Sequence, residues 1–129
     1  LNENILVIAD DDKALAMAGI MGGLNSSVTL DTHDILLESA YFAPEAVAGR
    51  ARQYGLTTDS AHRFERGVDP EGQLKAMERA SSLLLDIVGG ECGPVFEAQD
   101  PSFLPQSRQI QVNQSKVERY LSQSFAETQ

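Results

Sequence analysis

Ile35-Leu36-Leu37-Glu38-Ser39-Ala40-Tyr41-Phe42 is the stretch on which the expected fold of this chain depends. It predicts a buried β-strand, because it is short, apolar on both faces and bounded by polar residues. Period-two alternation places Glu38 on one face with Leu36, Ala40 and Phe42. A carboxylate in these surroundings should be substantially desolvated, which is costly without a hydrogen-bond donor. That donor is either an internal partner, such as an arginine, or a ligand.

The bulk composition indicates a single modest core. The chain has 129 residues and 42% hydrophobic content, which predicts one domain plus a fragment. No apolar stretch approaches membrane-spanning length, and the N-terminus lacks the pattern of a secretory signal. The single cysteine, Cys92, is expected to be a small buried thiol and fits a reducing compartment. We therefore expect a cytoplasmic protein with no membrane partner.

The charge distribution argues against a free-standing nucleic-acid clamp. The net charge is −9, whereas neutralising phosphates requires clustered Lys and Arg. Four arginines nevertheless gather in the middle of the chain, namely Arg50, Arg52, Arg63 and Arg66. They could form a basic edge facing a phosphate backbone, but we expect at least two of them to pair with Asp59, Glu65 or Asp69.

Hydrophobic periodicity and turn residues predict both strands and helices. Strands are expected at residues 5–9, 14–21, 35–42, 94–98 and 109–112. Helices are expected at 44–54, at 70–88 with Asp69 as cap and Pro70 in the first position, and at 113–121, capped by Asn113 or Ser115. A loop with a short helix is expected between the first two helices. Asp10, Asp11 and Asp12 predict a polar hairpin turn, because the ligand spacing of a calcium loop is absent.

These elements predict an α+β fold. We expect a mixed or antiparallel sheet built from the strands at 5–9, 14–21 and 35–42, packed by the helices that begin at Pro44 and Pro70. Residues 101–107 have the composition of a linker, which would separate a first domain at 1–100 from a second at 108–129. The second domain would begin with a short strand and a helix, and the chain is expected to end inside it.

The residues themselves supply little catalytic chemistry. His33 and His62 are the only histidines, and Ser60 and Asp59 would not face His62 on a helix. A Ser-His-Asp triad is therefore unsupported, and neither His nor Cys has metal-ligand spacing. Gly22-Gly23 permits close approach of a backbone or a ligand, but it lacks the context of a phosphate loop. The sequence thus predicts a pocket with a buried acceptor and no metal or cofactor site.

A family resemblance is carried by five stretches that occur in order. They are Leu6-Val7-Ile8-Ala9-Asp10, Ala18-Gly19-Ile20-Met21-Gly22-Gly23, Leu36-Leu37-Glu38-Ser39-Ala40, Gly49-Arg50-Ala51-Arg52 and Arg63-Phe64-Glu65-Arg66-Gly67-Val68-Asp69-Pro70. Together they resemble the C-terminal part of the editing domain of the bacterial phenylalanyl-tRNA synthetase beta subunit. The tail from Arg108 resembles the start of that subunit's next, winged-helix-like domain, with Ser122 where a glycine is usual.

The resemblance implies proofreading. In that family the alpha subunit sometimes attaches tyrosine to the phenylalanine tRNA, and the beta subunit hydrolyses the wrong ester. A pocket that merely accommodates a benzene ring cannot strongly reject an added hydroxyl, whereas a second site that hydrogen-bonds the hydroxyl discriminates by ~10⁴. By resemblance, Glu38 reads the tyrosine hydroxyl. The other pocket residues implied are Gly22, Gly23, Thr58 and Ser60.

The resemblance also implies what lies outside this chain. A histidine that positions the attacking water belongs upstream of Leu1, and Ser60 stands where the family usually has alanine. We therefore expect the isolated chain to be inactive, and the alternative function is a non-catalytic scaffold that supports the alpha subunit and positions tRNA. The implied partners are the alpha subunit, tRNA(Phe) and the rest of the beta subunit, while ATP and Mg²⁺ would be used elsewhere in the ligase. The residues interpreted as structural are Arg63, Glu65, Arg66 and Asp69.

Overall fold

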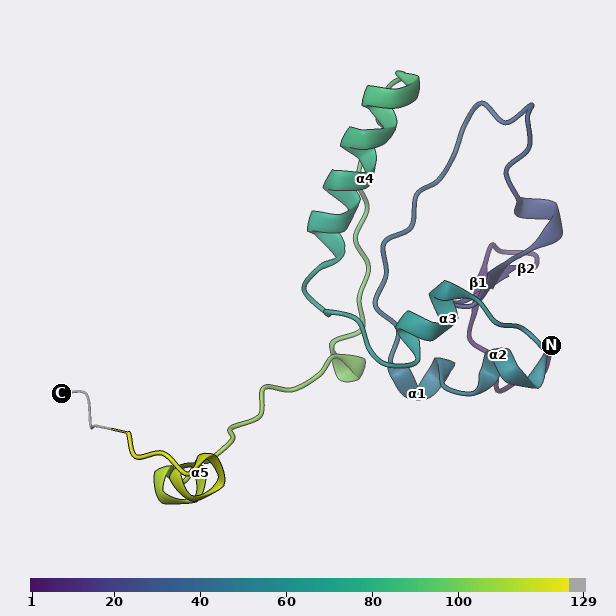
Figure 1. Ribbon diagram of the computed structural model, residues 1–129. Helices are drawn as coiled ribbons and strands as arrows, with labels where there is room; N and C mark the ends of the chain where they lie inside the picture. The colour runs from purple at the N-terminus through teal and green to yellow at the C-terminus, as the bar shows by residue number, and fades with distance from the viewer. Residues whose placement is uncertain (126–129) are drawn as a thin grey trace.

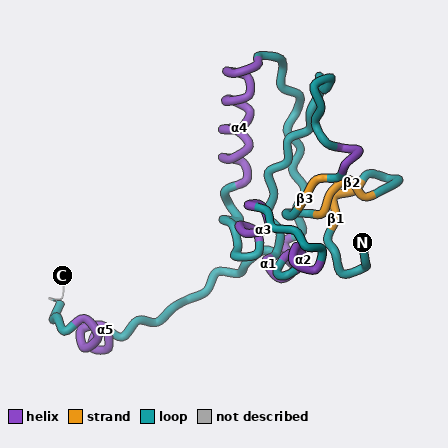
Figure 2. The backbone as a smooth tube through the Cα atoms, turned by 45° about the vertical axis from the view of Figure 1, so that its right-hand side comes forward, coloured by secondary structure: helices purple, strands orange, loops and turns teal. Residues whose placement is uncertain are grey.

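The computed structural model describes residues 1–125 and confirms the predicted α+β class (Figure 1). Strands β1 (Val7–Ala9), β2 (Ala14–Met17) and β3 (Met21–Gly22) form one antiparallel sheet in the order β1-β2-β3 (Figure 2). Residues 126–129, the end of the predicted second domain, lie outside the described part. The division into domains at residue 100 stays a prediction.

The turn between β1 and β2 is the predicted polar hairpin turn. The Asp10 carboxylate accepts hydrogen bonds from the backbone N–H groups of Asp12 at 2.9 Å and Lys13 at 2.8 Å. The strand predicted at 14–21 is instead two strands, because Gly19 adopts a φ of 64° and reverses the chain. After this turn Gly22 pairs with Ala16 across β2 and β3. Only the absence of a side chain makes this left-handed backbone inexpensive.

The helices follow the predicted order with shifted boundaries. They are α1 (Pro44–Val47), α2 (Arg50–Gln53), α3 (Asp59–Phe64), α4 (Gln73–Val88) and α5 (Gln114–Leu121), with 3₁₀ turns η1 (Leu24–Ser26) and η2 (Pro101–Phe103). The helix predicted at 44–54 is divided because Gly49 adopts a φ of 73°. Asp69 organises a turn rather than capping a helix at Pro70, since its carboxylate accepts from the Glu71 N–H at 3.0 Å and α4 begins later. Asn113 caps α5 as predicted.

The strand predicted at 35–42 is wrong. This segment is an irregular connection between η1 and α1 in the described structure (Figures 1 and 2). Leu36 is 95% exposed, which shows that the apolar pattern is not buried here. A strand needs a neighbour to satisfy its backbone groups, and none of the described segments pairs with this one. The strands predicted at 94–98 and 109–112 are absent from residues 1–125 for the same reason.

The core is small and joins the β2–β3 turn to the short helices. Ile20, Val47, Ala51 and Ala61 are buried together, and Met17, Phe42, Leu56 and Phe64 pack against them. The core therefore fixes α3 beside the sheet.

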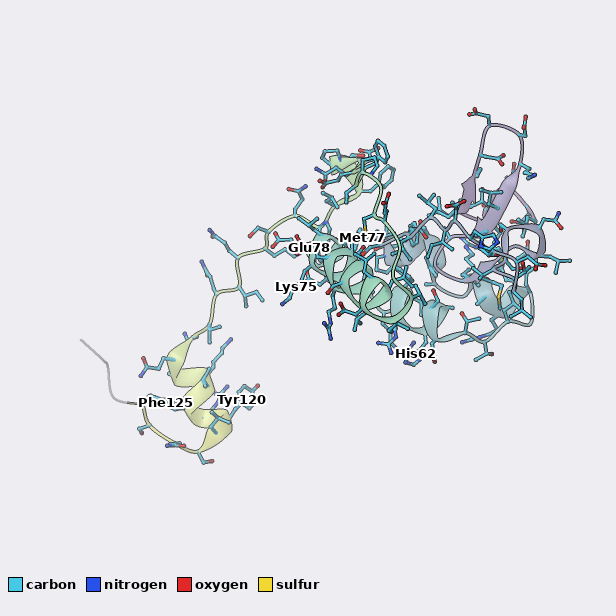
Figure 3. The ribbon with its side chains drawn as sticks, turned by 90° about the horizontal axis from the view of Figure 1, so that it is seen from above. His62, Lys75, Met77, Glu78, Tyr120 and Phe125 are labelled. Carbon is cyan, nitrogen blue, oxygen red and sulfur yellow. The ribbon has the colours of Figure 1, made fainter. Side chains whose placement is uncertain are left out.

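Two expectations about burial are wrong. None of the sixteen residues of α4 is buried, so its expected packing on the sheet is wrong. Figure 3 shows Lys75, Met77 and Glu78 on this helix, and α5 lies apart with Tyr120 and Phe125. Cys92 is exposed rather than buried.

Among the described residues no helix combines the length and apolar character needed to cross a membrane.

Candidate functional site

A cavity of about 440 Å³ lies between the hairpin, the segment after Leu37 and α3. It is open to solvent rather than enclosed. The lining residues are Ile8, Ala16, Met17, Ala18, Gly19, Ile20, Met21, Gly22, Glu38, Ala40, Phe42, Thr58, Ser60 and Phe64. The fold thus brings together four of the residues proposed from the sequence, namely Gly22, Glu38, Thr58 and Ser60.

Glu38 is the only ionisable side chain in this lining. The expectation of a buried acceptor is wrong, because the residue as a whole is exposed. Enough protein surrounds its carboxyl group, however, that partial desolvation raises its pKa above the ordinary value. Among residues 1–125 the sole ion pair joins Arg66 and Glu65, so no guanidinium neutralises Glu38 there. The cavity therefore presents a partly desolvated acceptor.

Thr58 fastens α3 to the β2–β3 turn. Its hydroxyl donates to the Ile20 carbonyl at 2.8 Å and accepts from the Ala61 N–H at 3.0 Å. The second bond caps the N-terminus of α3, where a backbone donor would otherwise lack a partner. The Thr58 hydroxyl proton is consequently committed to the protein backbone.

Ser60 makes a parallel connection one residue earlier on the turn. Its hydroxyl donates to the Gly19 carbonyl at 3.0 Å. The hydroxyl that distinguishes Ser60 from the alanine expected by resemblance is therefore held against the backbone by a hydrogen bond. Both hydroxyl protons are donated to carbonyls, so neither hydroxyl is free to donate to a ligand. Glu38 is the one ionisable acceptor that the lining offers to a ligand donor.

An aromatic pair forms one wall of the cavity. The ring centroids of Phe42 and Phe64 lie 5.0 Å apart, and the ring planes are tilted by 50°. This separation is within the range of favourable aromatic pairs. A Cβ atom on Gly19 would lie 3.0 Å from both rings, which is closer than ordinary van der Waals contact. Gly19 therefore lets the turn approach the aromatic wall.

Comparison with known proteins assigns the chain to a family. The model of the B3/4 domain matches residues 1–89, which include every residue of the cavity lining. The chain belongs to the B3/4 domain family.

The sequence of this B3/4 chain is similar to proteins named phenylalanine–tRNA ligase beta subunit. The identity is 60% over 121 residues with the Acinetobacter baylyi protein, covering 94% of this chain and 15% of the relative. It is 53% over 129 residues with the Colwellia psychrerythraea protein, covering 100% of this chain and 16% of the relative. The family resemblance seen in the sequence is confirmed, and the chain spans about a sixth of the length of these relatives.

The two adjacent glycines of the B3/4 chain have different surroundings. Gly22 lines the cavity, and a Cβ there would meet nothing within 4 Å. Gly23 is not part of that lining and borders a smaller cavity of about 230 Å³. Its N–H donates to the Leu15 carbonyl at 2.8 Å, and an added Cβ would come within 2.3 Å of that oxygen. The need for glycine at this position is therefore local packing.

The four residues interpreted as structural lie outside the cavity lining of the B3/4 chain. Arg66 donates to the Glu65 carboxylate at 2.7 Å and to the His62 carbonyl at 2.9 Å. Asp69 holds the turn before α4, while Arg63 is exposed and forms no ion pair within residues 1–125. The expectation that at least two of the central arginines pair with acids is thus wrong for the described residues.

Neither histidine belongs to the cavity lining, and both are exposed. His62 is labelled on α3 in Figure 3. No group of three or more His, Cys, Asp or Glu within residues 1–125 is arranged to hold a metal ion. Sequence reasoning missed Phe42, Phe64 and Gly19 as site residues, although Gly19 and Phe64 lie in stretches that carry the family resemblance and Phe42 ends the apolar run that contains Glu38. No local signal indicates that the two rings meet.

Proposed function

We propose that this B3/4 chain binds the tyrosyl group of mischarged tRNA(Phe) within a complete phenylalanine–tRNA ligase, as part of post-transfer proofreading. The observation that carries the proposal is the single cavity in which Glu38, Gly22, Thr58 and Ser60 converge. In this proposal the phenol ring would lie against the apolar part of the lining, where Glu38 is the one ionisable acceptor for its hydroxyl. Phenylalanine lacks the hydroxyl and leaves Glu38 without that partner.

The reaction in this proposal is hydrolysis of an ester. The water oxygen attacks the carbonyl carbon, the bond to the ribose oxygen breaks, and tyrosine and free tRNA are released. Residues of the B3/4 chain would supply recognition through Glu38 rather than a proton for the reaction, because the Thr58 and Ser60 hydroxyls already donate their protons to backbone carbonyls. The cavity lining contains no histidine that could act as a base, and we assign orientation of the water to the rest of the beta subunit.

We propose that this chain acts as part of a larger ligase with further subunits. The relatives are named as beta subunits, and we propose an alpha subunit, the rest of the beta subunit and tRNA(Phe) as partners of this chain in the cytoplasm. Synthesis of the aminoacyl ester with ATP and Mg²⁺ would take place outside these residues.

Replacement of Glu38 in an assembled alpha–beta ligase tests the proposal. Glu38→Ala should slow clearance of tyrosyl-tRNA(Phe) by about tenfold, the factor expected when a charge-assisted hydrogen bond is removed from a partly exposed site. Charging of tRNA with phenylalanine should be unaffected. Glu97→Ala is the matched control, because this glutamate is exposed and outside the cavity. Unchanged clearance with Glu38→Ala would favour the non-catalytic scaffold instead.

A further inference from the structure

The position of Glu38 is not set by a β-sheet. Its segment has no strand pairing, and within residues 1–125 no backbone–backbone hydrogen bond involves residues 35–42. Glu38 and Ala40 nevertheless line the cavity. A carboxylate that hydrogen-bonds a ligand hydroxyl must be held at a defined position in the cavity. Because backbone pairing does not fix this segment, side-chain contacts have to hold it in place.

Those contacts come from the first residue of α4. The Ser39 hydroxyl donates to the Gln73 carbonyl at 2.9 Å, and this bond is partly buried. The Gln73 side-chain amide donates to the Asp69 carbonyl at 2.8 Å and lies 3.4 Å from the Ala40 carbonyl, at the limit of a hydrogen bond. We call this arrangement the Ser39–Gln73 clasp.

Both residues of the clasp lie outside the cavity lining. Ser39 directly follows Glu38 but is absent from the lining, whereas Glu38 and Ala40 belong to it. Gln73 is also outside the lining and begins a helix of sixteen residues. The clasp therefore links the Glu38 segment to a regular element without touching a bound ligand.

We propose that Ser39 and Gln73 are positioning residues that set the selectivity of the cavity through Glu38. This inference rests on the proposed proofreading function and adds a control of selectivity to it. When the Ser39 hydroxyl is removed, the segment loses a connection to α4 and the carboxylate samples positions farther from the tyrosine hydroxyl. Selectivity for the tyrosyl ester then falls, while hydrolysis that does not depend on Glu38 is preserved.

The experiment compares hydrolysis of tyrosyl-tRNA(Phe) and phenylalanyl-tRNA(Phe) by the complete alpha–beta ligase. Ser39→Ala should lower the ratio of the two kcat/KM values roughly 3- to 10-fold, as expected for the loss of one neutral hydrogen bond. Ser39→Thr retains the hydroxyl and should restore the ratio. Ser82→Ala, at an exposed serine of α4, is the matched control and should leave the ratio unchanged.

Gln73→Leu provides a second variant, because it removes the amide donor while keeping a similar volume. It should lower the same ratio, which keeps the proposal testable if Ser39→Ala fails to assemble. Combining Ser39→Ala with Glu38→Ala provides a double-mutant cycle. A positioning role predicts that Ser39→Ala has no further effect on the ratio once Glu38 is gone.

The outcomes separate the inference from the function on which it rests. If Glu38→Ala lowers the ratio but neither clasp variant does, the clasp has no positioning role and the proofreading proposal stands. Equal losses for both esters would also overturn the inference, since they indicate general destabilisation. If Glu38→Ala itself leaves the ratio unchanged, the proposed function and the clasp's role both fail.

Discussion

Gly19 offers the sharpest test of how the site is built. It has a φ of 64°, and a Cβ atom would lie 3.0 Å from the rings of Phe42 and Phe64. Gly19→Ala should therefore combine two costs. A left-handed conformation costs an L-residue about 1–2 kcal/mol, and overpacking against a formed wall costs about 1–3 kcal/mol. Because both rings are only partly buried and can shift, we expect a loss of about 2–3 kcal/mol in the free energy of unfolding.

Urea unfolding followed by circular dichroism measures this loss. At a typical dependence of about 1–3 kcal/mol per molar, the midpoint should fall by roughly 0.7–3 M. Gly22→Ala is the matched control, because Gly22 lines the same cavity with no neighbour within 4 Å of its added Cβ. Gly19→Asn should fall between the two, since asparagine tolerates the left-handed region but keeps the Cβ. Equal midpoints for Gly19→Ala and Gly22→Ala would refute the reasoning.

Two further predictions concern the polar groups of the cavity. Thr58→Val removes both the cap on the Ala61 N–H and the bond to the Ile20 carbonyl, and should cost about 1–3 kcal/mol in urea unfolding. Thr58→Ser keeps both bonds, and equal midpoints for the two variants would contradict this role. Glu38 should destabilise the folded chain at neutral pH, because partial burial raises its pKa, so the folded state binds this proton more tightly than the unfolded state. The destabilisation should be absent below the ordinary glutamate pKa and should develop as the pH rises through the raised pKa. Urea midpoints of Glu38→Gln and the unmodified chain should diverge over that window in favour of Glu38→Gln, and a pH-independent difference would count against the pKa shift.

The local parts of the fold could be predicted because their partners are close in sequence. The Asp10 turn and the Asn113 cap are closed by side chains that bond to backbone groups within three residues. The interruption at Gly49 was harder to foresee, because a glycine within a helical pattern is compatible with both a continuous helix and a break. The strand at 35–42 was predicted from its apolar alternation. That pattern describes which surfaces could be buried, whereas a strand also requires a pairing partner.

The candidate site was predictable in its residue types but not in its geometry. The family resemblance indicated Glu38, Gly22, Gly23, Thr58 and Ser60, and the cavity lining contains all of them except Gly23. Sequence could not show that Thr58 bonds to Ile20, because the two lie far apart along the chain and meet only when the core closes. The contact between Phe42 and Phe64 likewise joins residues that are far apart along the chain. The sequence also could not show which arginines form ion pairs, because long side chains gain little from pairing at an exposed surface.

The sequence by itself determined the family, the α+β class and the identity of the one acid available to the cavity. Tertiary structure alone decided how far that acid is desolvated and which hydroxyl protons are already donated within the protein. The physical reason is that composition and local spacing fix hydrogen bonds between near neighbours. Desolvation of Glu38 and the commitment of Thr58 and Ser60 depend on surfaces contributed by segments that come together only in the folded chain.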